Sequence, residues 1–203
     1  MTAFSLIKSM AVLIIFLYIP PAGRSQQTGY IDGYIITNSN DTVYGLVKIR
    51  ETFPFVIRED VKFKKTEDSK PRSYYADEIK GFTAFEDVYI SKEFGKKKTT
   101  YFFRWIIKGY LNYYLTEYGN TAGNNMIMSH AILQKNGENE WHLDGGLSYP
   151  FKNKMMEYLK DAPALCDKIR TGIYNANHME KIVTEYNKLH PVTDKHNKFN
   201  ILL

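Results

Sequence analysis

The chain has 203 residues, a formal net charge of +5 and a single cysteine. One cysteine excludes an internal disulfide, and the mild charge argues against nucleic-acid binding, because each basic cluster lies beside acidic and loop-forming residues. The length suits one domain that buries a core without covalent staples.

The start of the chain has the pattern of a secretory signal peptide. A lysine precedes the apolar run Met10 to Ile19, and two prolines follow it. As a helix rising about 1.5 Å per residue, this run reaches about 15 Å into a hydrocarbon core of about 30 Å. Small residues at Gly23 and Ser25 suit a signal peptidase. We predict removal of residues 1–25 and no membrane span in the mature chain; the alternative is an N-terminal anchor.

Residues 26–149 are predicted to be rich in β-strands. Segments of Tyr, Phe, Ile, Val and Thr are separated by Asn, Asp, Gly or Pro at the spacing of all-β folds. The predicted strands begin at Tyr30, Thr42, Asp60, Glu78, Asp87, Thr99, Tyr110, Met126 and Asn139. Gly33 and Gly45 lie inside the first two strands, where glycine marks a bulge or a close approach of backbones in a curved sheet.

Two hairpins are expected from turn chemistry. The first joins its strands through residues 38–40, and the second turns at the pair Asn136-Gly137. A two-residue turn there sets Ile132 opposite Trp141. Alternation then predicts one buried face and leaves His142 on the other. The residues predicted for that buried face are Met128, His130, Ile132, Trp141 and Leu143.

From residue 150 onward the apolar period changes to three or four. It predicts helices near residues 152–160, 162–171 and 175–189, with Pro163 in a first turn and Pro191 ending the last helix. The fold class is therefore α+β: an antiparallel, curved or barrel-like sheet followed by C-terminal α-helices. We expect a single globular domain over residues 26–203, with a β-rich part (26–149), a helical part (150–191) and a tail (192–203).

The segment 101–118 is dense in aromatic residues. It holds the residues that we single out as ligand-contacting candidates, Trp105, Tyr110, Tyr113, Tyr114 and Tyr118. Two interpretations stay open: core packing in a curved sheet, or an aromatic platform that binds sugar, peptide or another protein. Arg104 is placed to pair with a carboxylate in either case.

Familiar catalytic motifs are missing from the sequence, and no catalytic residue, cofactor or metal ligand is assigned. Cys166 lies beside the apolar stripe of a predicted helix and is interpreted as a core residue. His130 is interpreted as a hydrogen-bonded core residue too. Acid pairs such as Asp77 with Glu78 and Glu86 with Asp87 are expected to be solvated turn residues.

Several blocks of the sequence share a pattern with a known group. GYIITNSNDTVYGLVKI, YYADEIKGFTAFEDVYISKEF, FFRWIIKGYLNYYL, ILQKNG and YLKDAPALCDKI occur in this order. The chain resembles exported proteins of unknown function from Bacteroidota. The resemblance implies export and a β-rich body with a helical C-terminal end, and it supplies no activity.

These observations predict an exported binding or structural module of the cell envelope, periplasmic or extracellular, without an evident catalytic site. Its expected partner is an envelope protein, a peptide or a glycan. The alternative is a hydrolase that acts on an envelope or extracellular polymer through two carboxylates placed across a cleft.

Overall fold

The computed structural model describes residues 29–49, 60–119, 127–143 and 151–192. Within these ranges the chain forms ten strands, three α-helices and one short 3₁₀-helix. In chain order they are β1 (Ile31–Thr37), β2 (Thr42–Ile49), β3 (Asp60–Lys64), β4 (Arg72–Tyr75), β5 (Ile79–Ala84), β6 (Asp87–Phe94), β7 (Thr99–Ile107), β8 (Leu111–Gly119), β9 (Ile127–Lys135), β10 (Trp141–Leu143), α1 (Phe151–Tyr158), α2 (Pro163–Arg170), η1 (Ala176–His178) and α3 (Met179–Leu189). The predicted α+β class is confirmed.

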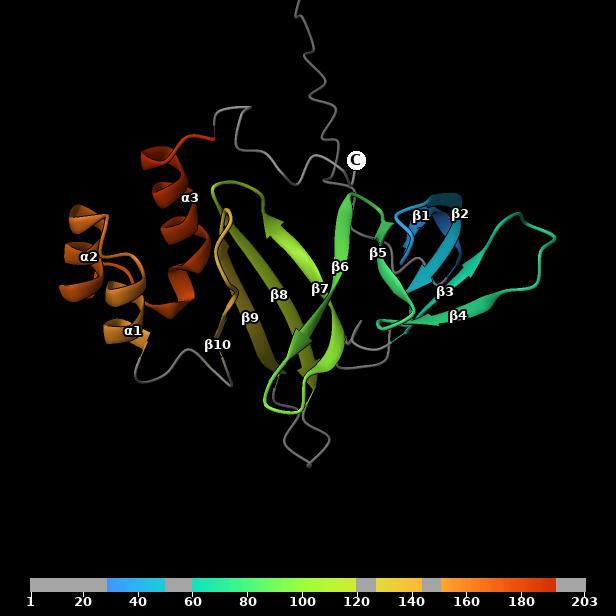
Figure 1. Cartoon of the computed structure of the whole chain (residues 1–203), viewed down its shortest axis with the longest axis horizontal. Helices are drawn as coiled ribbons and strands as arrows, with labels where there is room; N and C mark the ends of the chain where they lie inside the picture. Colours follow the sequence, from blue (N-terminus) through green and yellow to red (C-terminus); the bar gives the residue numbers. More distant parts are fainter. Residues whose placement is uncertain (1–28, 50–59, 120–126, 144–150, 193–203) are drawn as a thin grey trace, which may run out of the picture.

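All strands of the described residues belong to one sheet, in the order β10-β9-β8-β7-β6-β5-β1-β2-β3-β4. Every pair of neighbours is antiparallel. Strands that follow one another in the chain are neighbours, except that β5 pairs with β1. Figure 1 shows the helices beside β8, β9 and β10, while β1 to β4 form the far end.

Directly opposed residues share a face, so the register sorts the side chains of the sheet onto two faces. The face that α1, α2 and α3 cover is called the helix face. Near the helices its core includes Leu111, Tyr113 and Leu133, packed with residues of the helices such as Met155 and Tyr186. Toward the far end the helix face carries a second core: Ile35, Val47, Val61, Phe63, Ala76, Ile79, Phe82, Ala84, Tyr89 and Phe102.

The opposite face has a small core of its own over β6 to β9, made by Phe94, Phe103, Tyr114 and Ile132. The ring of Phe94 in β6 stacks on His142 of β10, with centroids 4.9 Å apart. Side chains from β6 and β10 therefore meet across the strands between them. The predicted curvature is present, and the sheet of the described residues is open, with β4 and β10 at its edges.

The predicted register of the second hairpin is wrong by one residue. Trp141 pairs with Leu133 and His142 with Ile132. Gly137 has a positive φ of 79°, but Asn136 does not, so the turn lacks the two left-handed residues that a two-residue hairpin of type I′ needs.

The slip of one residue exchanges the faces of β10. Trp141 and Leu143 lie on the helix face, whereas His142 joins His130 and Ile132 on the opposite face. The side chain of Met128 lies outside the described ones.

The first hairpin and the helix boundaries at Pro163 and Pro191 agree with their predictions. The first hairpin forms with its turn at residues 38–40 as predicted; Ile36 pairs with Thr42, and Asn40 in the turn has a φ of 72°. Pro163 opens α2 and α3 ends at Leu189, before Pro191. Strand β4 is not predicted from the sequence. No helix within the described ranges is both long and apolar enough to cross a membrane; the proposed signal peptide, residues 1–25, lies outside those ranges.

Substitution of Gly45 by alanine tests the close approach of strands. A Cβ at this position would lie 2.5 Å from the carbonyl oxygen of Lys64 and 2.6 Å from the ring of Phe63. Gly45→Ala should lower the free energy of unfolding by about 2 kcal/mol, measured by urea denaturation, because backbone atoms must move. Gly29→Ala is the control, since its Cβ meets nothing within 4 Å. Equal stability of the two variants would contradict this packing.

Candidate functional site

The structure does not gather the predicted aromatic residues on one surface. Trp105 and Tyr114 lie on the opposite face, with ring centroids 5.3 Å apart. Tyr113 lies on the helix face within the core. Tyr110 precedes β8 and stacks on His190 at 5.2 Å. Tyr118 belongs to β8, but its side chain lies outside the described ones.

Two of these tyrosines are core residues. The exposed fraction is 5% for Tyr113 and 3% for Tyr114. Burial raises the pKa of Tyr113 to about 12, and burial likewise raises the pKa of Tyr114. The ammonium of Lys92 lies 4.2 Å from the centre of the Tyr114 ring, which leaves this ring face occupied. These residues pack the curved sheet, which is the first of the two interpretations.

An open groove lies on the opposite face at the far end of the sheet. Its volume is about 670 Å³. Its lining residues, which define what we call the tyrosine groove, are Asp32, Gly33, Tyr34, Tyr44, Gly45, Leu46, Lys65 and Glu67. They come from β1, β2 and the connection between β3 and β4. Sequence reasoning assigned the two glycines to curvature and did not select the groove.

Register explains why these side chains meet. Tyr34 is directly opposite Tyr44, and Asp32 is directly opposite Leu46, so the four point to one side of the β1–β2 hairpin. Between them Gly33 faces Gly45. A Cβ on Gly33 would lie 2.5 Å from the carbonyl oxygen of Thr83, so the strand needs glycine there.

The two tyrosines form an edge-to-face pair with ring centroids 5.5 Å apart. Tyr44 is 73% exposed, whereas Tyr34 is only partly exposed. Burial, and then the proximity of Tyr44, raise the pKa of Tyr34. Its phenol therefore keeps its proton at neutral pH and can both donate and accept a hydrogen bond.

Charged groups surround the tyrosine pair. Glu67 is 74% exposed at its side chain and forms an ion pair with Lys64. The Lys64 ammonium also donates to the backbone carbonyl of Glu67 at 2.9 Å. Asp32 and Lys65 are exposed. The groove thus offers a ring face, a phenol, carboxylates and an ammonium within one open surface.

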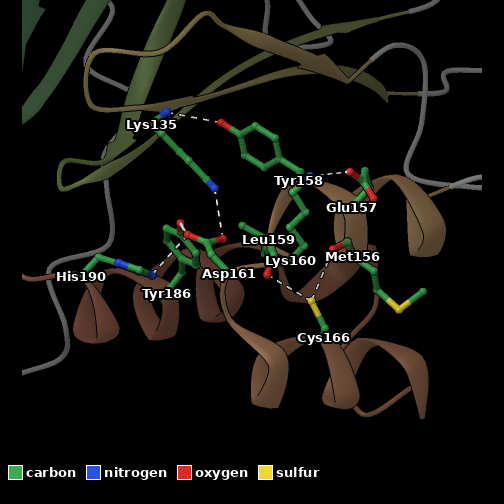
Figure 2. Close-up of polar contacts among 10 residues, drawn as sticks. All are labelled: Lys135, Met156, Glu157, Tyr158, Leu159, Lys160, Asp161, Cys166, Tyr186 and His190. Atoms are coloured by element: carbon green, nitrogen blue, oxygen red, sulfur yellow. Dashed lines mark hydrogen bonds and ion pairs between the residues drawn. The ribbon is translucent and has the colours of Figure 1, made fainter.

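A second polar cluster lies between β9 and the helices, and Figure 2 shows its members. The Lys135 ammonium lies 3.2 Å from Oδ1 of Asp161, and the Tyr186 hydroxyl donates to Oδ2 at 2.5 Å. His190 Nε2 lies 3.6 Å from the same Oδ2. The Lys135 backbone N–H also donates to the Tyr158 hydroxyl at 3.3 Å.

This cluster joins the sheet to the helices. Lys135 is 8% exposed and Tyr186 is fully buried, so each needs a partner to offset its lost hydration. Asp161 provides that partner to both, and its two oxygens are engaged. Burial and the hydrogen bond to Asp161 raise the pKa of Tyr186, which keeps the phenol protonated. These contacts connect the helices to the sheet, so the role of the cluster is structural.

Cys166 has the geometry of a core cysteine. Its thiol donates to the carbonyl of Leu159 at 3.2 Å and to that of Met156 at 3.5 Å (Figure 2). Burial raises the pKa of the thiol. The reactive thiolate is therefore disfavoured.

In each predicted acid pair, one carboxylate has a polar partner within the described structure. Glu78 accepts from the backbone N–H of Tyr75 at 2.8 Å and from Arg72 at 3.0 Å. Asp87 pairs with Arg104 at 3.5 Å, the kind of partner expected for this arginine. Among the residues that the structure describes, no group of three or more His, Cys, Asp or Glu side chains is arranged to hold a metal ion.

Asp161→Ala tests the structural role of the polar cluster. Loss of this carboxylate leaves the buried Lys135 without its ion pair, so the free energy of unfolding should fall by about 2 kcal/mol in thermal or urea unfolding. Glu157→Ala is the matched control. It breaks an exposed pair with Lys160 and should change stability much less. A larger loss for Glu157→Ala would contradict the assignment.

Acidification tests the same carboxylate. Burial opposes ionisation of Asp161, but hydrogen bonds from Tyr186 and Lys135 outweigh it and hold the pKa below its ordinary value of 3.8. The carboxylate therefore stabilises the fold fully above that value, and the gain is lost as the pH falls through the lower folded pKa. Between about pH 5 and about pH 2, wild type should lose more stability than Asp161→Asn. Parallel pH profiles for the two proteins would show that Asp161 does not contribute.

Comparisons of the chain with protein-family models, with curated proteins and with solved structures found no match. The resemblance to exported Bacteroidota proteins stays a prediction.

Proposed function

We propose that this protein is an exported binding module of the cell envelope, without a catalytic site, and that the tyrosine groove binds a glycan. The observation that carries the proposal is Tyr44, which is 73% exposed beside an open groove of about 670 Å³. An aromatic ring in that position gives up water contact when a ligand covers it, and its hydroxyl stays available for hydrogen bonding.

The mixture of groups at the groove favours a hydroxyl-rich ligand. Asp32 and Glu67 accept hydrogen bonds, Lys65 donates them, and the tyrosine hydroxyls do both. The rings of Tyr34 and Tyr44 supply an apolar wall. Such a combination of one apolar surface with a few polar groups is typical of sites for small or chain-like ligands.

The distribution of exposed apolar residues disfavours a large protein interface. The large hydrophobic side chains exposed in the described residues are Tyr44, Tyr75, Phe85, Ile173, Leu189 and Val192. They belong to separate strands, turns and helices, and only Tyr44 lines the groove. Protein interfaces usually need a contiguous buried centre of aromatic and aliphatic residues.

Export supports the choice of ligand. The signal-peptide pattern of residues 1–25 predicts a protein that works outside the cytoplasm, where envelope and extracellular glycans are found. The openness of the groove suits a polymer whose chain continues beyond the contact.

The alternative function, a carboxylate hydrolase, is favoured by one observation: Asp32 and Glu67 line the same groove. Glu67 is the weaker candidate for an acid, because it is ion-paired with Lys64 and mostly exposed, whereas a general acid in glycoside hydrolysis is held protonated by its surroundings. Incubation of the protein with polysaccharides and measurement of new reducing ends distinguishes the two. Product formation that Glu67→Gln abolishes would establish the hydrolase.

Tyr44→Ala tests the binding module. In binding assays on a panel of immobilised envelope and extracellular polysaccharides, the variant should bind at least tenfold more weakly than wild type, because it loses the exposed ring of the groove. Tyr75→Ala is the matched control, since Tyr75 is 55% exposed on β4 and does not line the groove.

Unchanged binding by Tyr44→Ala would contradict the proposal, and so would an equal loss in Tyr75→Ala. Failure of the wild-type protein to bind any member of the panel would remove the glycan from the proposed function altogether.

A further inference from the structure

We propose that the glycan bound at the tyrosine groove is anionic, and that Lys48 and Lys62 hold its acidic groups. This inference rests on the proposed function and adds the charge of the ligand to it. The surface concerned continues the groove along β1, β2 and β3 on the opposite face of the sheet.

The register lays these residues out as adjoining rows. Along β2 the side chains of Tyr44, Leu46 and Lys48 point to the same face, because they are two residues apart. Leu46 pairs with Lys64 and Lys48 pairs with Lys62 on β3. Lys48 is therefore the next residue on this face after Leu46, which lines the groove, and it lies about 13 Å from Tyr44 along the strand.

Lys48 and Lys62, which we call the lysine pair, are directly opposite each other on neighbouring strands. Like charges in this position destabilise a sheet. In the described part of the chain, neither ammonium has a carboxylate within ion-pair distance. The fold thus keeps two adjacent positive charges without an ion pair to a described carboxylate, although Asp60 lies two residues before Lys62 on the same face of β3.

A third lysine, Lys64, lies beside the lysine pair on the same face. The ammonium of Lys64 lies 4.7 Å from the centre of the Tyr30 ring, and that of Lys48 lies 5.8 Å from the same centre. Two cations share one ring there. Of these three lysines, Lys64 alone has a carboxylate partner among the described residues, Glu67 at the groove, so the described charges without an ion pair are those of the lysine pair.

The arrangement of charge selects the class of ligand. Carboxylates of Asp32 and Glu67 at the groove would repel a polymer with a charge on every unit of its backbone, such as a nucleic acid. The same carboxylates accept hydrogen bonds from sugar hydroxyls. A glycan that carries acidic groups at intervals places a neutral ring against Tyr44 and an acidic group on the lysine pair.

The experiment compares acidic polysaccharides with neutral versions of the same chains. Hyaluronate, unsulfated chondroitin and gellan, in which uncharged sugars separate the acidic ones, are each paired with the carboxyl-reduced polymer, and binding to the protein is measured by calorimetry at low and at high salt. At least one acidic polymer should bind tenfold or more tightly than its reduced partner, and the difference should shrink at high salt, because salt screens exposed charges.

The double variant Lys48→Gln, Lys62→Gln should remove that preference and leave binding of the reduced polymer unchanged. The control is Lys152→Gln, Lys154→Gln on α1, which removes the same charge from exposed residues away from the groove. It should keep the full preference for the acidic polymer. Circular dichroism verifies that both variants are folded.

Four results would overturn the inference. Equal binding of acidic and reduced polymers removes the role of charge but leaves the glycan-binding function standing. An equal loss in the control variant shows a non-specific effect of net charge. Tighter binding of single-stranded DNA or anionic phospholipid vesicles than of any glycan, dependent on Lys48 and Lys62, assigns the lysine pair to another ligand. Absence of binding to every polymer ends both proposals.

Discussion

The close approach of backbones at glycine is the constraint on which this structure depends. A side chain at Gly33 or Gly45 would meet a carbonyl oxygen 2.5 Å away, and one at Gly81 would meet the carbonyl of Tyr89. Because these positions carry no Cβ, the strands at the far end can coil tightly around one core. That core continues along the helix face through Phe82 and Phe102, whose rings meet edge to face at 4.9 Å.

The same constraint shapes the candidate site. With Ile35, Val47 and Val61 directed to the helix face, alternation directs the neighbouring positions to the opposite face. Those positions include Tyr34, Tyr44, Lys48 and Lys62. The lysines on the two faces of the sheet differ in burial and in pairing. Lys135 is buried and paired with Asp161, which joins the helices to the sheet, whereas Lys48 and Lys62 keep unpaired charges in the described structure. The first arrangement stabilises the fold, and the second suits a ligand.

Local pattern predicts most elements of this fold, because alternation and helical periodicity are properties of short segments. The strand Asp87–Phe94 and the helix that begins at Pro163 follow directly from such patterns. Strand β4 was not predicted, because the segment RSYY is only four residues long and follows Lys-Pro. It is too short to show an alternation of apolar and polar residues. The register of β9 with β10 escapes because it depends on the φ of Asn136, which residue type alone does not fix.

The site is harder to predict than the elements. Aromatic density pointed to the segment 101–118, but a strand in the middle of a sheet directs alternate rings into two cores, as Tyr113 and Tyr114 show. The groove instead depends on which side of the β1–β2 hairpin lies uncovered, and that is decided by packing of residues far apart in the chain. The available signal was the predicted turn over residues 38–40, because counting outward from that turn sets Tyr34 opposite Tyr44, the pair that the structure has.

An NMR titration of the isotopically labelled protein with a soluble acidic oligosaccharide tests the central claim most directly. The account predicts that the largest changes in chemical shift fall on the residues of β1, β2 and β3, with Tyr44, Lys48 and Lys62 among them, and that α1, α2 and α3 are unaffected. Changes centred on the helices or on β7 and β8, or no changes at β1 to β3, would contradict it.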